Sequence, residues 1–261
     1  MKAVILCGGI GTRIRDVSEI LPKPMLPIGD KPILWHIMKI YANYGIRDFV
    51  LCLGYKGWTV KEFFLNYHTK VSDVTVSLGK SDCIQFYSAT DEDDWNVTLA
   101  ETGEKSQTGA RIWNVRKYLE GEKYFCVTYG DGVSDINISD LLDVHKKSGV
   151  VCTVTGVRPE GRFGELVIEK DKVTEFSEKT NVRSGYVNGG FMVFDAAKVW
   201  KYFRHGEDLI LEGHVLAQIA RDGQLGVYKH DGFWYCCDTP REYAKLNELW
   251  ESTKAPWKMW R

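Results

Sequence analysis

Short apolar segments bounded by glycine, proline or aspartate alternate along the chain with longer segments whose apolar residues recur at helical spacing. This alternation is typical of βα units packed around a mainly parallel sheet. We therefore predict an α/β fold with a single Rossmann-like domain, in which helices flank a mainly parallel mixed sheet. The expected strands are Ala3–Cys7, Asp48–Leu53, Val74–Leu78, Tyr124–Tyr129, Val151–Val157 and Gly190–Phe194. The expected helices are Ile33–Tyr44, Gly57–Asn66, Asp140–Ser148, Ala196–Phe203 and Val215–Asp222.

The sequence contains no internal repeat, no low-complexity tract and no linker rich in proline, glycine and serine, so residues 1–240 are expected to form one domain. Residues 241–261 are expected to form a polar helix and a tail in which Trp257 and Trp260 are exposed. The chain has 9 Trp, 13 Tyr and 11 Phe, more than a plain α/β core usually needs. We therefore predict that the C-terminal segment is an oligomerisation arm, docking on another subunit of a homo-oligomer.

Composition narrows the classes of function. The 261 residues include 34 Lys and Arg against 35 Asp and Glu, a formal net charge of −1, which disfavours a nucleic acid polymer or a membrane as the partner. The first apolar run is shorter than the core of a signal peptide, and no later run approaches ~18 uncharged apolar residues, so a cytoplasmic protein is expected. Seven cysteines without a Cys-x-x-Cys pair predict reduced thiols.

Three features are expected to be structural and not chemical. Cys236 and Cys237 are adjacent, and neighbours on a strand point to opposite faces, so we expect them to serve packing and not a redox function. The acidic run Asp91–Asp94 is expected to be a solvated turn and not a cation site. His36 lies within the expected helix Ile33–Tyr44 and is expected to be structural.

The first strand runs into Gly8-Gly9-Ile10-Gly11-Thr12-Arg13. Glycines let backbone N–H groups approach a phosphate, and the guanidinium of Arg13 adds a forked donor. A dinucleotide-binding fingerprint would need glycine where the chain has Ile14, and the Gly-Lys-Ser at 79–81 lacks the earlier glycine of a P-loop because Val74 stands there. The loop therefore predicts a phosphate site of neither of these two kinds.

A second cation follows where Pro22 and Pro24 flank Lys23. The two prolines restrict the backbone, so less entropy is lost when the ammonium binds a phosphate. Together, Gly-Gly-x-Gly-Thr-Arg and Pro-Lys-Pro resemble the sugar-phosphate nucleotidyltransferase family, which makes nucleotide-sugars from sugar 1-phosphates. The resemblance covers the chain from start to end, since further motifs follow in the family's order: Tyr129-Gly130-Asp131-Gly132, Glu178-Lys179, Asn188-Gly189-Gly190 and Asp238-Thr239.

Asp131 and Asp238 each follow an apolar run, at the point where a strand ends and a loop begins. Ligands of open α/β sheets bind at the carboxyl ends of the strands. Mg²⁺ prefers one or two carboxylates together with phosphate oxygens and water. In a phosphate-binding protein these two aspartates therefore predict a Mg²⁺ pair, and the resemblance implies the same role.

The resemblance implies in-line attack of a sugar 1-phosphate oxygen on the α-phosphorus of a nucleoside triphosphate, with pyrophosphate leaving. A phosphate monoester, with a second pKa near ~6, is already largely dianionic at neutral pH, so the attack requires no general base. No Ser/His/Asp or Cys/His constellation is recognisable in the sequence, which agrees with this chemistry. Arg13 and Lys23 are expected to be the catalytic residues, acting through positioning and charge neutralisation.

The resemblance also assigns the binding residues and implies the nucleotide-diphospho-sugar transferase fold. The expected nucleotide contacts are Leu6, Gly8, Gly9, Gly11, Thr12, Arg13, Lys23, Ser106, Arg111 and Gly130, with Arg111 on a loop that begins at Thr108. The sugar phosphate is expected to contact Glu178, Lys179, Asn188 and Gly189, and the metal Asp131 and Asp238.

Within the family, the chain resembles the branch that joins CTP to glucose 1-phosphate, giving CDP-glucose for dideoxysugars of surface polysaccharides such as O-antigen. The closing Lys254-Ala255-Pro256-Trp257-Lys258 is one of the segments that carry this resemblance, which also implies a hexamer. The chain departs from the family pattern at Cys7, Ala110 and Thr180, and it has His214-Val215-Leu216 where relatives often have Glu-Pro-Leu. Three alternatives stay open: the same chemistry with UTP or dTTP, another sugar 1-phosphate, and a non-catalytic nucleotide-sugar binding protein.

Overall fold

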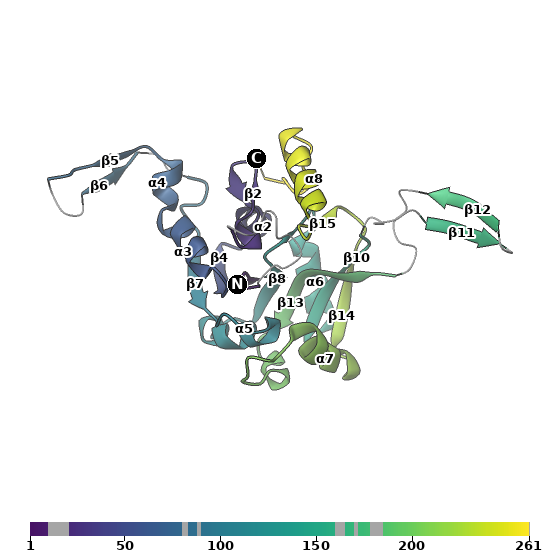
Figure 1. Cartoon of the computed structure of the whole chain (residues 1–261). Coiled ribbons are helices and arrows are strands. Elements are labelled where there is room, and N and C mark those ends of the chain that lie inside the picture. The colour runs from purple at the N-terminus through teal and green to yellow at the C-terminus, as the bar shows by residue number, and fades with distance from the viewer. Residues whose placement is uncertain are drawn as a thin grey trace.

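The computed structural model describes residues 1–9, 21–79, 83–87, 90–159, 165–169, 172–177 and 185–260, with the backbone alone for 165–169 and 172–177. A seven-stranded sheet with the order β14-β10-β13-β8-β1-β4-β7 forms the centre (Figure 1). Its strands are parallel to their neighbours except β13, which is antiparallel to both. The predicted fold class is therefore confirmed. The strands are β1 (Lys2–Leu6), β4 (Asp48–Leu53), β7 (Asn96–Glu101), β8 (Tyr124–Tyr129), β10 (Cys152–Val157), β13 (Val187–Asp195) and β14 (Leu225–His230).

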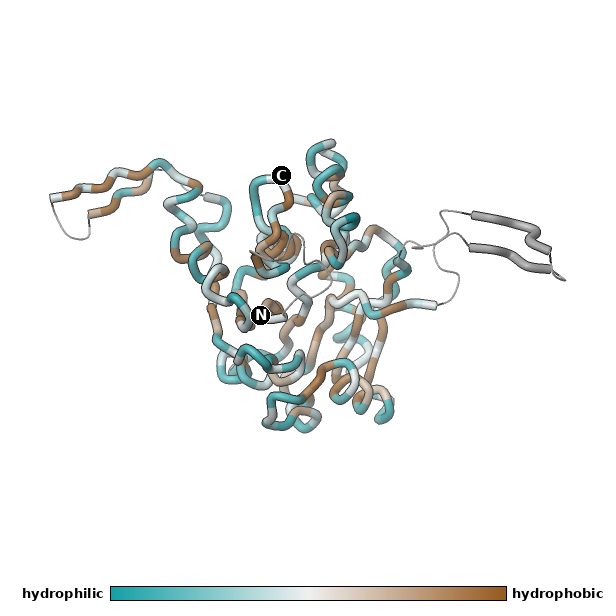
Figure 2. The backbone as a smooth tube through the Cα atoms, viewed as in Figure 1, coloured by the Kyte–Doolittle hydropathy of each residue, from teal (hydrophilic) through white to brown (hydrophobic). Residues whose placement is uncertain are grey.

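Helices cover both faces of this sheet, so its middle strands are buried on both sides, as parallel strands usually are. Along β1, Ala3 and Ile5 pack in one core cluster, whereas Val4 and Leu6 pack in the other. Figure 2 shows the apolar residues concentrated along the central strands. One face is covered by α2 (Ile33–Ala42), α6 (Ile138–Ser148) and α8 (Pro240–Glu251), and the other by α5 (Thr108–Val115), η5 (Leu211–Leu216) and α7 (Ala217–Arg221).

The predicted strand Val74–Leu78 does not join the central sheet. Residues Val74–Val76 form β5, which pairs with β6 (Ile84–Phe86) in a separate hairpin that projects from the body of the molecule (Figure 1). The sheet edge beside β4 is instead β7, which sequence analysis missed. Alternate residues of β7, Val97 and Leu99, pack against the core, and this burial favours β7 at the edge.

The predicted helix Ala196–Phe203 is also wrong, because only one 3-10 turn, η4 (Val199–Tyr202), forms there. The Asp195 carboxylate accepts hydrogen bonds from the backbone N–H of Ala197 and of Lys198, and this local bonding competes with a regular helix. The predicted helix Val215–Asp222 is divided between the end of η5 and α7. The helices expected at Ile33–Tyr44, Gly57–Asn66 and Asp140–Ser148 are present with slightly different ends.

The remaining elements are short: η2 (Lys23–Met25), β2 (Pro27–Ile28), β3 (Lys31–Pro32), α3 (Gly57–Leu65), α4 (Tyr67–Val71), η3 (Arg116–Leu119), β9 (Gly132–Ser134), β11 (Glu165–Glu169), β12 (Lys172–Ser177) and β15 (Trp234–Cys236). No helix in the described part of the chain is both long enough and apolar enough to cross a membrane.

The C-terminal tail folds back on its own chain, where Trp260 is half-buried against Trp35, so the expectation of exposure is wrong for Trp260 and for Trp257. The side chain of Trp257 is fully buried, with its ring stacked 5.6 Å from Phe233 and 6.4 Å from Trp250 between ring centroids. Its indole N–H faces Nδ1 of His36 at 3.4 Å. Burial of a large apolar ring outweighs the entropy of ordering the tail. Part of the aromatic surplus therefore serves the interior, and whether residues 241–261 also contact another subunit stays a prediction.

His36 is a core residue, as expected. Its Nε2 lies 2.9 Å from the carbonyl oxygen of Ile28, and burial lowers the pKa of the ring to about 4. A neutral ring with its proton on Nε2 donates to Ile28 and accepts from Trp257. His36 thus joins α2 to the C-terminal tail.

The acidic run departs from expectation at one residue. The Glu92 side chain is 9% exposed, pairs with Lys39 at 3.0 Å and accepts a hydrogen bond of 2.9 Å from the Tyr67 hydroxyl. Asp91 and Asp94 remain exposed, with 77% and 60% of their side chains accessible. The run is therefore a solvated turn that Glu92 anchors to α2.

Candidate active site

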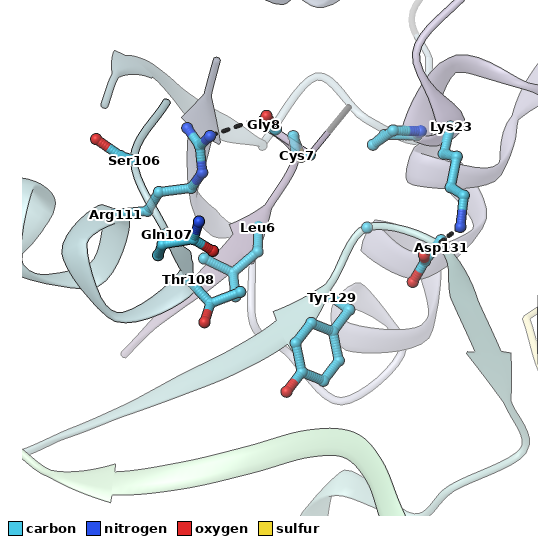
Figure 3. Close-up of a pocket in the computed structure, with 13 residues that line it drawn as sticks. Leu6, Cys7, Gly8, Lys23, Ser106, Gln107, Thr108, Arg111, Tyr129 and Asp131 are labelled. Carbon is cyan, nitrogen blue, oxygen red and sulfur yellow. Dashed lines mark hydrogen bonds and ion pairs between the residues drawn. The ribbon is translucent and has the colours of Figure 1, made fainter. Parts of the chain in front are cut away.

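A cavity of about 220 Å³ opens at the carboxyl ends of β1 and β8 (Figure 3). This is the edge where open α/β sheets bind ligands. All the expected nucleotide contacts that fall within the described residues line it, and so does Asp131. Gly11, Thr12, Arg13, Glu178 and Lys179 lie outside the described residues. The lining residues are Leu6, Cys7, Gly8, Gly9, Lys23, Pro24, Ser106, Gln107, Thr108, Arg111, Tyr129, Gly130 and Asp131.

The guanidinium of Arg111 is held by the protein itself. Arg111 lies on helix α5, not on a loop as expected, and only 4% of its surface is exposed. Its Nη2 donates to the carbonyl oxygen of Gly8 at 2.9 Å (Figure 3), and its Nη1 donates to that of Leu53 at 3.0 Å. Further bonds go to the carbonyl oxygens of Gly103 and Glu104 and to the Thr102 hydroxyl. Arg111 therefore ties the ends of β1, β4 and β7 together.

Two glycines make room for this guanidinium. A Cβ atom on Gly8 would lie 2.2 Å from Nη1 of Arg111, and a Cβ atom on Gly54 would lie 2.4 Å from the same nitrogen. Neither distance is possible without displacing the arginine. The sequence predicts that Gly8 lets the backbone approach a phosphate, whereas in the structure its lack of a side chain leaves room for the Arg111 guanidinium.

Lys23 lies between the two predicted metal ligands. Its ammonium donates to Oδ2 of Asp131 at 3.5 Å (Figure 3), and also to Oδ1 of Asp238. The proline frame places Lys23 at the start of η2, where its carbonyl oxygen accepts from the N–H of Leu26. Burial lowers the pKa of Lys23, but the two carboxylates outweigh this effect and raise it overall. The ammonium is therefore firmly charged in this position.

The two aspartates come together from distant parts of the chain. Asp131 follows β8, and the N–H of Cys237 donates to its carbonyl oxygen at 2.8 Å. Asp238 precedes α8, where Thr239 caps the helix and the Glu242 carboxylate accepts from the N–H of Asp238. Both carboxylates reach the ammonium of Lys23 and so lie close together, whereas their role as a Mg²⁺ pair stays a prediction.

This donor set fits Mg²⁺. No group of three or more His, Cys, Asp or Glu side chains suited to a metal occurs among the described residues. Mg²⁺ is commonly bound by one or two carboxylates and completes its shell with phosphate oxygens and water. Asp131 and Asp238 supply that number, and the cation they share here is the ammonium of Lys23.

The expected sugar-phosphate residues Asn188 and Gly189 lie on β13, beside the cavity and not in its lining. Nδ2 of Asn188 donates to the hydroxyl oxygen of Tyr129 at 3.3 Å, and the carbonyl oxygen of Gly189 accepts from the indole of Trp234 at 2.7 Å. Gly190 has φ +94°, and a Cβ atom there would lie 2.7 Å from the Tyr129 ring. Tyr129 thus connects these residues to the cavity.

Sequence analysis missed several residues of the lining. Tyr129 stands in the quoted Tyr-Gly-Asp-Gly motif, and its position at the end of a predicted strand could have pointed to it. Gln107 and Thr108 begin α5, a helix that was not predicted. Cys7 and Pro24 are next in sequence to predicted nucleotide contacts, and this adjacency was the only signal in the sequence that they line the site.

The model of the nucleotidyl transferase family matches residues 2–251, and the chain belongs to that family. Fold and cavity agree with this class. The chain is 43% identical to the glucose-1-phosphate cytidylyltransferase of Salmonella typhi, with 100% of both chains covered. It is 42% identical to a probable glucose-1-phosphate cytidylyltransferase of Bacillus subtilis (strain 168), again with 100% of both covered. A putative glucose-1-phosphate thymidylyltransferase from Bacillus anthracis shares the fold, with a TM-score of 0.69 at 19% identity over 95% of this chain and 94% of that one.

Proposed function

We propose that the protein transfers a cytidylyl group from CTP to α-D-glucose 1-phosphate, forming CDP-glucose and pyrophosphate. The observation that carries this proposal is the 43% identity, over the full length of both chains, to a glucose-1-phosphate cytidylyltransferase. CTP and glucose 1-phosphate are cytoplasmic metabolites, so we expect the reaction in the cytoplasm. CDP-glucose would supply dideoxysugars for surface polysaccharides.

The chain's own residues suit a reaction that needs positioning more than proton transfer. Glucose 1-phosphate is largely dianionic at neutral pH, so its oxygen attacks the α-phosphorus of CTP without a base. The backbone N–H groups of Gly8 and Gly9 stand at the end of β1, where a triphosphate would lie against them. Ser106 would hydrogen-bond to the nucleotide from the opposite wall. Asn188 and Gly189 would contact the sugar phosphate, as would Glu178 and Lys179.

Asp131 and Asp238 would hold Mg²⁺, which when bound supplies charge neutralisation to the phosphates. Lys23, which pairs with both carboxylates, lies close enough to contact a phosphate oxygen of the triphosphate and would oppose the charge that builds up as pyrophosphate leaves. Arg13 would act in the same way from the glycine loop.

A substrate panel tests the proposed function. Pyrophosphate release is measured with CTP, UTP and dTTP, each with glucose 1-phosphate and with other sugar 1-phosphates. We expect the highest kcat/KM for CTP with glucose 1-phosphate. Equal or higher values with another nucleotide or sugar would reassign the substrate, and nucleotide binding without turnover would favour a binding protein.

A pair of lysine variants tests the role of Lys23 within this panel. Lys23→Met should lower kcat/KM roughly 100-fold or more, because it removes a charge aimed at the transferring phosphates. The matched control is Lys245→Met, since Lys245 is an exposed lysine of α8 paired with Glu248. Equal rates in the two variants would contradict the assignment of Lys23.

We further propose that the protein is a homo-oligomer, for which the resemblance suggests a hexamer, and that the hairpin β5–β6 is a subunit contact. The hairpin exposes five large apolar residues, Val76, Leu78, Ile84, Phe86 and Tyr87, and Figure 2 shows its strands rich in apolar positions. A cavity of about 210 Å³ near α3 and α4 has a mixed lining that includes Phe64, Leu65 and Trp95 together with His68 and Glu92. Exposed apolar surface of this extent marks interaction sites.

Light scattering after size exclusion tests the subunit contact. Ile84 is 56% exposed, so Ile84→Asp should leave the fold intact and lower the molar mass of the assembly. The exposed His205→Asp on another surface is the control. A monomeric wild-type protein, or an unchanged mass for Ile84→Asp, would contradict this proposal.

A further inference from the structure

Glu212 lies at the edge of the cavity, outside every motif that sequence analysis selected. It occupies the first turn of η5, and its side chain is open to solvent. One carboxylate oxygen, Oε2, accepts a hydrogen bond of 2.9 Å from the Thr108 hydroxyl, and the other, Oε1, accepts from the Tyr129 hydroxyl. Thr108 and Tyr129 both line the cavity, and Figure 3 shows both side chains there. One carboxylate therefore bridges the nucleotide-side helix α5 and the end of β8.

The bridge continues to the sugar side. The hydroxyl of Tyr129 donates its hydrogen bond to Glu212, so the hydroxyl oxygen is available to accept the hydrogen bond from Nδ2 of Asn188. Oδ1 of Asn188 accepts from the N–H of Gly190 at 3.0 Å. These two bonds fix which way the amide of Asn188 points. The second Nδ2 proton makes no hydrogen bond within the described part of the chain and can serve a ligand.

The two residues that Glu212 joins differ in how far they depend on its carboxylate. The Thr108 hydroxyl also accepts a hydrogen bond of 2.9 Å from the N–H of Leu211, which does not involve Glu212. Among the described residues, the Tyr129 hydroxyl donates a hydrogen bond to Glu212 alone. Loss of the carboxylate would therefore release Tyr129 and Asn188 more than Thr108.

We propose that Glu212 is a positioning residue for the sugar: its carboxylate orients the hydroxyl of Tyr129, and thereby the amide of Asn188, so that this amide donates to a sugar hydroxyl. The inference rests on the proposed function for the identity of the acceptor, glucose 1-phosphate. Glu212 itself makes no bond to the reacting phosphates. The site would thus recognise the sugar through a relay of three side chains from three elements, η5, β8 and β13.

Substitutions that break the relay test the proposal through the separate KM values of the two substrates. Glu212→Ala and Tyr129→Phe should each raise the KM for glucose 1-phosphate roughly three- to tenfold, the effect of losing one neutral hydrogen bond. The KM for CTP should stay within about twofold, since Thr108 keeps its tie to Leu211. The double variant should be no worse than the more affected single variant, because both changes break one relay.

Two further variants separate hydrogen bonding from charge. Glu212→Gln can still accept from Tyr129 through its amide oxygen and donate to Thr108 through its amide nitrogen, so its KM for glucose 1-phosphate should lie near that of the wild type. Asp208→Asn is the matched control, because it removes one negative charge from the same segment, at an exposed carboxylate that accepts two hydrogen bonds from Arg204. It should behave as wild type.

The outcomes separate this proposal from the proposed function. The Kd of glucose 1-phosphate, measured by calorimetry, needs no turnover, so weaker binding in Glu212→Ala would support the relay even if no CDP-glucose forms. An unchanged KM and Kd, an equal rise for both substrates, or a Glu212→Gln variant as impaired as Glu212→Ala would overturn it. So would a wild-type protein that binds no glucose 1-phosphate. If Glu212→Ala does not fold, Tyr129→Phe decides alone by the same criteria.

Discussion

Substitution of Trp257 by alanine tests whether the C-terminal tail belongs to the core of its own chain. The side chain is fully buried and packs against Phe233, Trp250 and His36. Removing a buried tryptophan typically costs about 3–5 kcal/mol, through lost transfer energy and the cavity left behind. The whole stability of a protein is only about 5–15 kcal/mol. Trp257→Ala should therefore remove a large fraction of the free energy of unfolding.

Part of that loss comes from the hydrogen bond to Nδ1 of His36. Trp257→Phe keeps an aromatic ring but removes the indole N–H and leaves Nδ1 without its partner, which should cost about 1–3 kcal/mol. For a chain of this size, about 1 kcal/mol corresponds to roughly 2–4 °C in Tm. Trp257→Ala should thus lower Tm by roughly 6–20 °C and Trp257→Phe by clearly less.

Urea and thermal unfolding followed by circular dichroism measure these differences. The control is Trp58→Ala, since Trp58 is 67% exposed and its loss should cost less than about 0.5 kcal/mol. If Trp257→Ala is within about 1 kcal/mol of Trp58→Ala, the tail is not part of the core. A loss that disappears when the assembly is diluted to monomers would place Trp257 between subunits and would equally refute the reasoning.

Two further predictions concern acid stability and the metal. Burial lowers the pKa of His36 and of His145 to about 4, from an ordinary value of 6.5, so between these pH values the unfolded chain binds protons that the folded chain does not. The free energy of unfolding should be highest above pH 6.5 and fall by roughly 3 kcal/mol per histidine toward pH 4; urea titrations across this range would show it, and a flat profile would contradict it. Asp238→Asn should lower kcat roughly 100-fold or more at saturating Mg²⁺ with little change in Tm, and steady-state assays that gave a wild-type rate would show that Asp238 holds no metal.

Strands buried on both faces could be predicted from the sequence, whereas the choice of edge strand could not. The runs Ala3–Cys7 and Asp48–Leu53 are almost wholly apolar, which is typical of central parallel strands. At the edge, Asn96–Glu101 mixes polar and apolar residues and is no more strand-like than Val74–Leu78. Which of the two pairs with β4 depends on distant backbone geometry that no local pattern contains.

The positions of the site could be predicted further than the contacts within it. Asp131 and Asp238 lie close together, each paired with Lys23, and strand ends were the signal in the sequence that pointed to both positions. Arg111 was selected as a nucleotide contact, yet its described partners are carbonyl oxygens and a hydroxyl of the protein. Backbone acceptors leave no trace in a sequence, because every residue has a carbonyl. The relay through Glu212 joins side chains that are far apart in the sequence, so it could be found only in three dimensions.

The packing of Gly8 and Gly54 against Arg111 limits how this site can change by mutation. The two glycines are far apart in sequence, yet both would collide with the same guanidinium if either gained a side chain. An alanine at Gly8 or at Gly54 would displace the guanidinium of Arg111, and either that displacement or a smaller residue at position 111 leaves several carbonyl oxygens without a donor. The effects of substitutions at positions 8, 54 and 111 are therefore coupled. Libraries that change them one at a time should recover few active variants, and homologues that differ at one should differ at the others.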